Sequence, residues 1–328
     1  MDTYSSLASS PRVKASNLGF LSHDGVTQIK GVMLSPADKR ATSPKAVIQI
    51  LHGMEEYIGR YAAFATYLAE QGFVVCMADM IGHGRSVASP EKLSCMPIKN
   101  GKTVLIEDVH ELRKTVSARF SRQTPYFIFG HSMGSLLLRV YMAQYGAGLA
   151  GVILSGTSQE PQFMTQFGTA YARMRAFFKG EDYKSATLEN LVVGVFEKQI
   201  ENPRTNLDWL STDEAVVDAY IADPLCGIPF SAGAHGALTR LAGESARAST
   251  AVKVPKDLPA FFVAGALDPV GAKTVGVEKA AALLRNAGLQ RVDTKYYDGM
   301  RHEILNEPGK KEVYTDILQW IDSVLDKA

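Results

Sequence analysis

The sequence predicts an α/β fold with a mostly parallel eight-stranded sheet, helices on both faces and an inserted helical cap. Short, continuously apolar runs alternate with helical patterns, which is typical of parallel strands buried between two helical layers. One serine stands in Gly130-His131-Ser132-Met133-Gly134, between a strand-like run and a helix-like run. The alternation breaks once, at residues 156–240, where helical patterns continue without a convincing strand.

Eight strands are expected. Two early ones, at residues 13–20 and 26–34, are joined by a turn at His23-Asp24-Gly25. The remaining six are five continuously apolar runs and a later strand-like stretch: 46–51, 73–78, 126–129, 151–154, 260–264 and 291–297. Helical patterns between them, such as those at 61–68 and 105–116, supply the covering layers.

Residues 156–240 are interpreted as a helical cap (lid) inserted into a core of residues 1–155 and 241–328. Within the cap, aromatic and methionine side chains recur three or four residues apart and mark one helix face. That face either lines an acyl-chain passage or packs the cap onto the sheet. Transient contact with a membrane surface through the cap is a further expectation. The candidate substrate contacts on it are Phe163, Phe167, Tyr171 and Met174.

Bulk properties exclude several classes of function. The 328 residues include 35 basic and 34 acidic side chains, and a net charge of +1 gives no long-range field to gather nucleic acid or anionic lipid. The longest apolar run, at 73–78, is far too short for stable membrane insertion, and the first residues lack an export signal. A cytoplasmic protein is therefore expected. Its three cysteines have no metal-ligand spacing, and nothing indicates its oligomeric state.

The serine motif predicts a nucleophile elbow. A strand that turns into a helix within so few residues strains the serine backbone and brings chain segments close, so small residues are needed at Gly130 and Gly134. The turn would lift the Ser132 hydroxyl off the sheet edge. It would also aim the first amides of the following helix at the same point, where an anion is stabilised.

A serine hydroxyl needs a base and a carboxylate that orients this base. Of seven histidines, His302 is favoured because it lies in a loop just after a late strand. Asp268 is the favoured carboxylate, since it follows the apolar run at 260–264 and stands between Ser132 and His302 in the chain. Asp293 and Asp298 are rivals by position, but the first lies inside a predicted strand and the second in a turn.

Acyl transfer also needs donors for the oxyanion. We assign these to the backbone amides of Met133, at the start of the helix, and of Met54, in the loop after the strand at 46–51. No metal or cofactor is implied, because the histidines are scattered and no glycine-rich phosphate loop is present.

Several motifs together resemble the monoacylglycerol lipase and lysophospholipase branch of the α/β-hydrolase superfamily, which is grouped with serine aminopeptidases. The likeness covers nearly the whole chain and is that of a bacterial-like member. The motifs that carry it are His52-Gly53 with Glu56 and Gly59-Arg60-Tyr61, Asp79 with Gly82-His83-Gly84 and Ser86, the serine motif, Asp223 to Gly227, Gly265 to Gly271, and Arg301-His302-Glu303 with Leu305-Asn306-Glu307. The resemblance implies the same nucleophile, base and orienting carboxylate.

By this resemblance, Glu56 and Arg60 would lie near the alcohol portion of the substrate. The alternative is a structural i, i+4 ion pair in the first turn of a helix. Met54-Glu55 stands where mammalian members have small residues, so a narrower mouth to the acyl site is expected.

The function expected is a serine hydrolase that cleaves a lipid-like carboxylic ester, a monoacylglycerol or lysophospholipid, through an acyl-enzyme. One alternative is a broad carboxylesterase. Another is an aminopeptidase, for which Glu55 or Glu201 could hold the substrate amine. A ligand-binding protein without catalysis is the least favoured alternative, because all three triad residue types are present.

Overall fold

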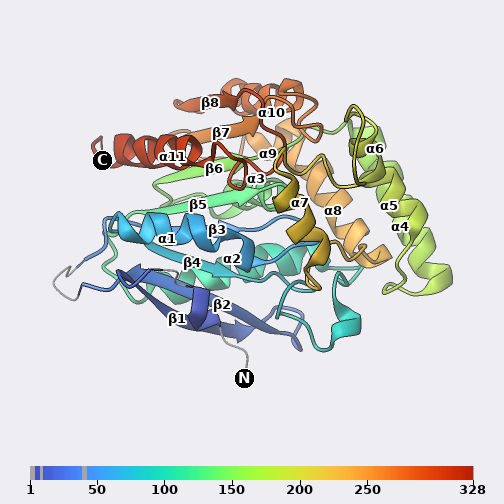
Figure 1. Cartoon of the computed structure of the whole chain (residues 1–328), viewed down its shortest axis with the longest axis horizontal. Helices are drawn as coiled ribbons and strands as arrows, with labels where there is room; N and C mark the ends of the chain where they lie inside the picture. The colour runs from blue at the N-terminus through green and yellow to red at the C-terminus, as the bar shows by residue number, and fades with distance from the viewer. Residues whose placement is uncertain (1–3, 8–9, 39–42, 328) are drawn as a thin grey trace.

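The computed structural model describes residues 4–7, 10–38 and 43–327. Its centre is one eight-stranded sheet of order β1-β2-β4-β3-β5-β6-β7-β8 (Figure 1). Strand β2 is antiparallel to both β1 and β4, and all other neighbours are parallel. The strands are β1 Val13–Leu21, β2 Gln28–Pro36, β3 Val47–Leu51, β4 Val74–Ala78, β5 Tyr126–His131, β6 Gly151–Ser155, β7 Ala260–Gly265 and β8 Val292–Tyr297. The predicted fold class is confirmed.

The early turn is longer than expected. The Asp24 carboxylate accepts hydrogen bonds from the amides of Val26 and Thr27, both at 2.8 Å. These amides are therefore not available to the sheet, and β2 begins at Gln28 instead of Val26.

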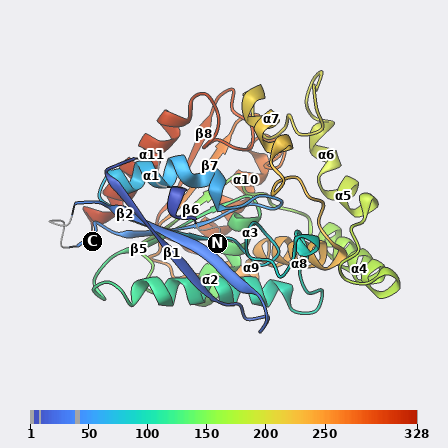
Figure 2. The same ribbon diagram turned by 60° about the horizontal axis from the view of Figure 1, so that its bottom comes forward.

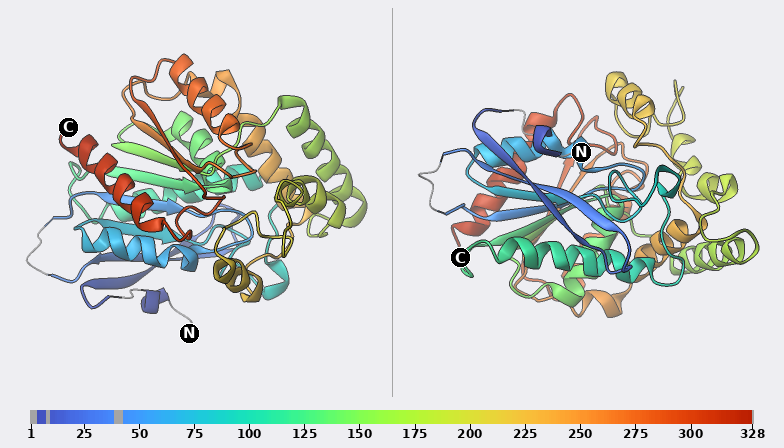
Figure 3. Two further views of the ribbon diagram at one scale, coloured as in Figure 1. Left: turned by 45° about the horizontal axis from the view of Figure 1, so that its top comes forward. Right: turned by 90° about the horizontal axis from the view of Figure 1, so that it is seen from below.

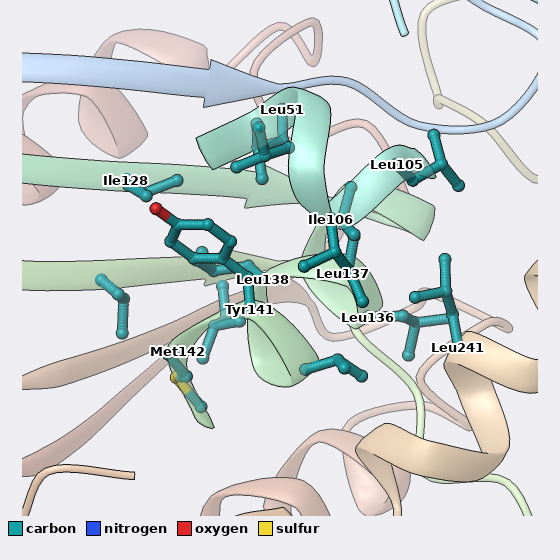
Figure 4. Packing of buried hydrophobic residues seen from close by; sticks show 14 of the residues in the cluster. Leu51, Leu105, Ile106, Ile128, Leu136, Leu137, Leu138, Tyr141, Met142 and Leu241 are labelled. Atoms are coloured by element: carbon teal, nitrogen blue, oxygen red, sulfur yellow. The ribbon is translucent and has the colours of Figure 1, made fainter. Parts of the chain in front are cut away.

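Helices cover both faces of the sheet (Figure 2). On one face lie α1 Ala62–Glu70 and α11 Lys310–Leu325, and on the other lie α2 Gly101–Ser117, α3 Met133–Tyr145 and α10 Val275–Asn286. Each face has its own hydrophobic core, the first beneath α1 and α11 and the second beneath α2, α3 and α10. Alternate residues of β5 point to opposite faces, so Phe127 and Phe129 belong to the first core and Ile128 to the second. Figure 4 shows how this second core packs, with Tyr141 of α3 beside Ile128 of β5 and Leu137 of α3 beside Ile106 of α2.

The interruption after β6 forms helices that gather at one end of the sheet (Figure 3). They are α4 Gln162–Lys179, α5 Ala186–Val192, α6 Gly194–Glu197 and α7 Glu214–Ala222, followed by α8 Ala232–Ser245 and the short α9 Ala248–Ala251. Helix α8 packs against α4, but also against α2 and α3, and Ala237 and Leu241 belong to the second core. The boundary predicted at residue 240 therefore lies inside a helix that cap and core share.

A short 3-10 helix, Tyr4–Leu7, lies near the amino end of the chain, and two others are Ile58–Tyr61 and Pro90–Lys92. Across the described ranges, no helix has both the length and the apolar character needed to cross a membrane.

Candidate active site

Ser132 sits between the end of β5 and the start of α3, in a strained conformation with φ 51° and ψ −119°. A Cβ atom on Gly130 would lie 2.5 Å from the carbonyl oxygen of Gly134, and one on Gly134 would lie 2.4 Å from that of Leu51. Neither position can accept a side chain without a backbone shift. The crowding that the motif predicts is therefore present, and it holds the serine in a backbone region that residues other than glycine rarely adopt.

The imidazole of His302 and the carboxylate of Asp268 are hydrogen-bonded, with 2.9 Å between Nδ1 and Oδ2. Asp268 follows β7 and His302 follows β8, so the edge of the sheet brings together residues far apart in sequence. Both side chains are almost completely buried. Burial disfavours the imidazolium, but the charge of Asp268 and its hydrogen bond outweigh this effect and raise the pKa of His302 above 6.5.

The rival carboxylates lie elsewhere. Asp293 bonds to Arg291 and to the indole N–H of Trp320, both at 2.7 Å, and Asp298 is exposed in its turn. Asp268 is further fixed by the Val270 amide, which donates to Oδ1 at 2.9 Å. Of the three aspartates, it is the one that the structure joins to His302.

Ser132 and His302 border the same small cavity, which has a volume of about 20 Å³. Within the described residues, no hydrogen bond joins the two side chains. The loop that carries Met54 closes the cavity on one side, since a Cβ on Gly53 would lie 3.3 Å from the Cβ of Ser132. The cap supplies an apolar wall of Val193, Leu207, Trp209, Leu210 and Tyr220.

Among the described residues, the two amides assigned to the oxyanion site are free to donate hydrogen bonds to a ligand. In the part of the chain that the structure describes, neither the Met54 N–H nor the Met133 N–H donates a hydrogen bond to a protein acceptor. Met133 is the first residue of α3, where the helix leaves its amides unpaired. Two unpaired N–H groups beside a serine at the head of a helix can stabilise an anion.

Glu56 and Arg60 lie in a buried network behind this loop. Glu56 Oε1 accepts hydrogen bonds from the Gly53 amide at 2.5 Å and the Tyr61 hydroxyl at 2.6 Å. Arg60 lies 3.9 Å from Glu56 and pairs with Glu303 at 2.5 Å. Burial raises the pKa of Glu56 to about 7, with Arg60 lowering it and Glu303 raising it. The structural ion pair is therefore present, and Glu56 also borders the cavity beside Ser132.

The aromatic face of the cap does not reach this cavity. Phe163, Phe167 and Met174 of α4 are 72%, 65% and 44% exposed, and Tyr171 packs on the small cluster around Ala172. The buried side of α4 is instead the one that faces α8, with Thr165 and Ala172. The helix periodicity was therefore visible in the sequence, but not which of its sides is covered.

The sequence offered little sign of the cap segment that covers His302. The Trp209 ring lies 5.2 Å from the imidazole ring, and the carbonyl oxygen of Trp209 accepts the His302 amide. Arg301 donates to the carbonyl oxygens of Asp208 and Ser211, at 2.6 and 3.2 Å. Arg301 adjoins the histidine and could have been singled out, whereas Trp209 lies in a stretch without periodicity.

Two further histidines that lie beside a glycine, His52 and His83, bond to backbone. His52 Nδ1 lies 2.7 Å from the Gly53 carbonyl oxygen, and His83 Nδ1 lies 3.0 Å from that of Ile81. No group of three or more His, Cys, Asp or Glu side chains among the described residues is arranged to hold a metal ion.

Comparisons with known proteins give a consistent result. The model of the family described as "Serine aminopeptidase, S33" matches residues 42–309. The chain is 28% identical over 291 residues to a monoacylglycerol lipase of Mycolicibacterium smegmatis, covering 87% of this chain and 90% of that protein. It is 24% identical over 297 residues to human monoglyceride lipase, covering 86% and 84%. A solved carboxyl esterase of Bacillus coagulans, in complex with glycerol, superposes with a TM-score of 0.87 at 31% identity, covering 95% and 99%.

Proposed function

Because the chain belongs to the serine aminopeptidase (S33) family, we propose that it cleaves a lipid-like carboxylic ester through an acyl-enzyme formed on Ser132. It is a carboxylic ester hydrolase of the α/β-hydrolase fold, and the resemblance found in the sequence is confirmed. The substrate we propose is a monoacylglycerol or a lysophospholipid. The relatives named as monoacylglycerol and monoglyceride lipases support the acylglycerol.

The observation that carries the mechanism is the His302–Asp268 pair, which borders the same cavity as the serine of the elbow. Asp268 holds Nδ1, so that Nε2 is left to take the hydroxyl proton of Ser132. The serine oxygen attacks the ester carbonyl, and the Met54 and Met133 amides stabilise the oxyanion. His302 then protonates the leaving alcohol, and water attacks the acyl-enzyme by the same steps.

We propose the cap, residues 156–240, as the part that admits the acyl chain. A cavity of about 20 Å³ holds no more than about one water molecule, so an ester can bind only after the roof moves. The side chains that would meet the acyl chain then are the apolar ones of that roof, among them Val193, Leu207 and Leu210. The exposed residues of α4 would meet it only outside the site.

The experiment that tests the proposal is a Ser132→Ala variant assayed on a water-soluble aryl ester and treated with a serine-directed fluorophosphonate. Loss of about 10⁶-fold in kcat is expected, with no covalent label. Ser117→Ala changes a serine at the exposed end of α2 and should react like the unmodified chain. A labelled, active Ser132→Ala protein would refute the assignment.

A broad carboxylesterase is the second candidate, and the small closed cavity favours it. The two candidates differ in chain-length preference. A series of glycerol esters from butanoyl to hexadecanoyl would separate them, since only a lipid-specific enzyme gains kcat/KM with acyl length.

The aminopeptidase alternative finds less support. Glu55 borders the cavity, but burial, and next the nearby charge of Glu189, raise its pKa well above the usual range. A raised pKa favours the neutral carboxylic acid, which binds an ammonium group more weakly than a carboxylate does. Glu201 is exposed on the cap and does not border the cavity.

A further inference from the structure

The outer side of α4 is an apolar stripe that faces water. Phe163, Phe167, Met174 and Phe178 share one side of the helix and are 72%, 65%, 44% and 71% exposed. Phe177 beside them is 83% exposed. Contiguous exposed apolar surface of this kind marks a contact site for another phase or molecule.

A cationic pocket lies along the same helix. It is a surface pocket of about 400 Å³ between α4 and α8, which run side by side in Figures 1 and 2. Four cationic side chains and a single carboxylate line it: Lys102, Arg173, Arg240, Arg247 and Glu244.

The carboxylate neutralises only one of these cations, because Glu244 pairs with Lys102. Arg247 donates to the neutral amide of Gln162 at 3.1 Å. Arg240 donates to backbone carbonyl oxygens, and its Nε is buried without a partner. Arg173 has no hydrogen bond or ion pair within the described residues. Three guanidinium groups therefore face one pocket with no carboxylate of their own.

Two of these guanidinium groups repel each other. Both line the same pocket, and burial, and then the charge of Arg173, lower the pKa of Arg240. A planar fork of donors matches the oxygens of a phosphate. An anion in the pocket would reduce this repulsion.

The stripe and the pocket occupy neighbouring sides of one helix. The α4 residues that line the pocket are Thr165, Gln166, Thr169, Ala170 and Arg173, and Met174 of the stripe directly follows Arg173. At 100° per residue, the two sets are separated by about a third of a turn. An object that meets both must present phosphate oxygens beside hydrocarbon, which is the chemistry of a phospholipid surface.

We propose that the α4/α8 edge docks on membranes that contain anionic phospholipid, with the phosphate headgroup in the cationic pocket and the apolar stripe among the acyl chains. This inference rests on the proposed function, because a lipid ester substrate is delivered from such a surface. It adds a preference for anionic over neutral membranes, because a neutral bilayer would contact the apolar stripe but offer no anionic headgroup to the pocket.

Vesicle sedimentation tests the proposal, with vesicles of phosphatidylcholine alone and of phosphatidylcholine with about a third phosphatidylglycerol. The chain should bind the anionic vesicles more tightly, and added salt should weaken this preference. In Arg173→Gln/Arg247→Gln, affinity for anionic vesicles should fall by roughly 25-fold, at about fivefold for each charge removed. Phe163→Ser/Phe167→Ser should lose binding to both kinds of vesicle.

The matched control is Arg119→Gln/Arg122→Gln, which removes two exposed charges after α2, away from the pocket. It should bind as the unmodified chain does. Equal binding to the two vesicles, or an equal loss in the control, overturns the proposal. So does binding of soluble glycerol phosphate without vesicle binding.

Activity on a water-soluble aryl ester keeps this test separate from the proposed function. The Arg173→Gln/Arg247→Gln variant should retain that activity, because neither arginine borders the catalytic cavity. A failure of the Ser132 assignment would appear in the ester assay and leave the vesicle result unchanged.

Discussion

The Gly53 amide donates a hydrogen bond of 2.5 Å to Oε1 of Glu56, and this contact ties the loop beside Ser132 to a buried network. The same oxygen also accepts the Tyr61 hydroxyl. Because the next amide along the chain is that of Met54, the position of Glu56 determines where this N–H points. We therefore propose Glu56 as a positioning residue for the proposed oxyanion site.

Replacing Glu56 tests this role. Glu56→Ala removes the acceptor and should lower kcat by about 10- to 100-fold, somewhat less than deleting an oxyanion donor, with little change in KM. Glu56→Gln keeps an oxygen in the same place and should restore most of kcat. Steady-state kinetics on an aryl ester give the comparison. An equal loss in both variants would contradict a role through the Gly53 hydrogen bond.

Asp268→Asn should lower kcat by about 10⁴-fold, since an amide no longer holds the imidazole in the productive tautomer. Asp298→Asn is the control, because that carboxylate is exposed in its turn. Retention of full activity by Asp268→Asn, with His302→Ala inactive, would show that another group orients the base.

The pH profile reports the charge around His302. The imidazole must be neutral to act as a base, so activity rises as pH passes its pKa. Burial lowers this pKa, whereas the charge and hydrogen bond of Asp268, and then the nearby charge of Glu303, raise it. Glu303→Gln should therefore move the acidic limb of the kcat/KM profile to lower pH. Glu312→Gln, at an exposed position on α11, should leave the acidic limb where it is. If Glu303→Gln also leaves the acidic limb unchanged, this electrostatic account is wrong.

Arg301 should hold the cap over the histidine. Arg301→Met removes donors to the carbonyl oxygens of Asp208 and Ser211, contacts worth about 1 kcal/mol each. Amide hydrogen exchange of residues 207–212 should become faster, while α3 keeps its protection. Arg285→Met, far from this segment on α10, should have no such effect. If amide exchange of residues 207–212 is unchanged in Arg301→Met, other contacts hold this segment over the histidine.

Shortening an apolar side chain that covers the cavity should widen the range of acyl chains that the protein accepts. Leu207→Ala enlarges the cavity beside Ser132, so the ratio of kcat/KM for a decanoyl over a butanoyl ester should rise by about tenfold. Phe163→Ala on α4 should leave this ratio unchanged with soluble esters, because that side chain lies outside the cavity. If this ratio rises in Phe163→Ala and not in Leu207→Ala, the acyl chain passes along α4 instead.

The sheet could be predicted because its strands are short and buried on both faces, which leaves apolar runs such as 126–129 clearly marked. The three residues of the proposed triad could be placed for a similar reason. Each follows a recognisable strand, and carboxyl ends of parallel strands meet at one edge. The pairing of Asp268 with His302 agrees with that placement, whereas contact between Ser132 and His302 stays a prediction.

The cap was harder to predict. Periodicity located α4 but could not show that Phe163 faces water, since a helix side is covered or open according to what packs on it. Overall charge misleads in a related way. A net charge of +1 gives no sign of the cationic pocket, because Lys102, Arg173 and Arg240 come together only when α4 and α8 pack beside the core.

The sharing of α8 between core and cap limits which segment can swing. Helix α4 is fastened along its length to α8, and α8 in turn is embedded in the core. We therefore expect the proposed opening motion in residues 181–230, which the bridge between Lys184 and Ser231 anchors near both ends. On this view, the surface proposed to rest on a lipid bilayer would stay fixed to the core, and the proposed gate over the serine would be a different piece of the same insertion.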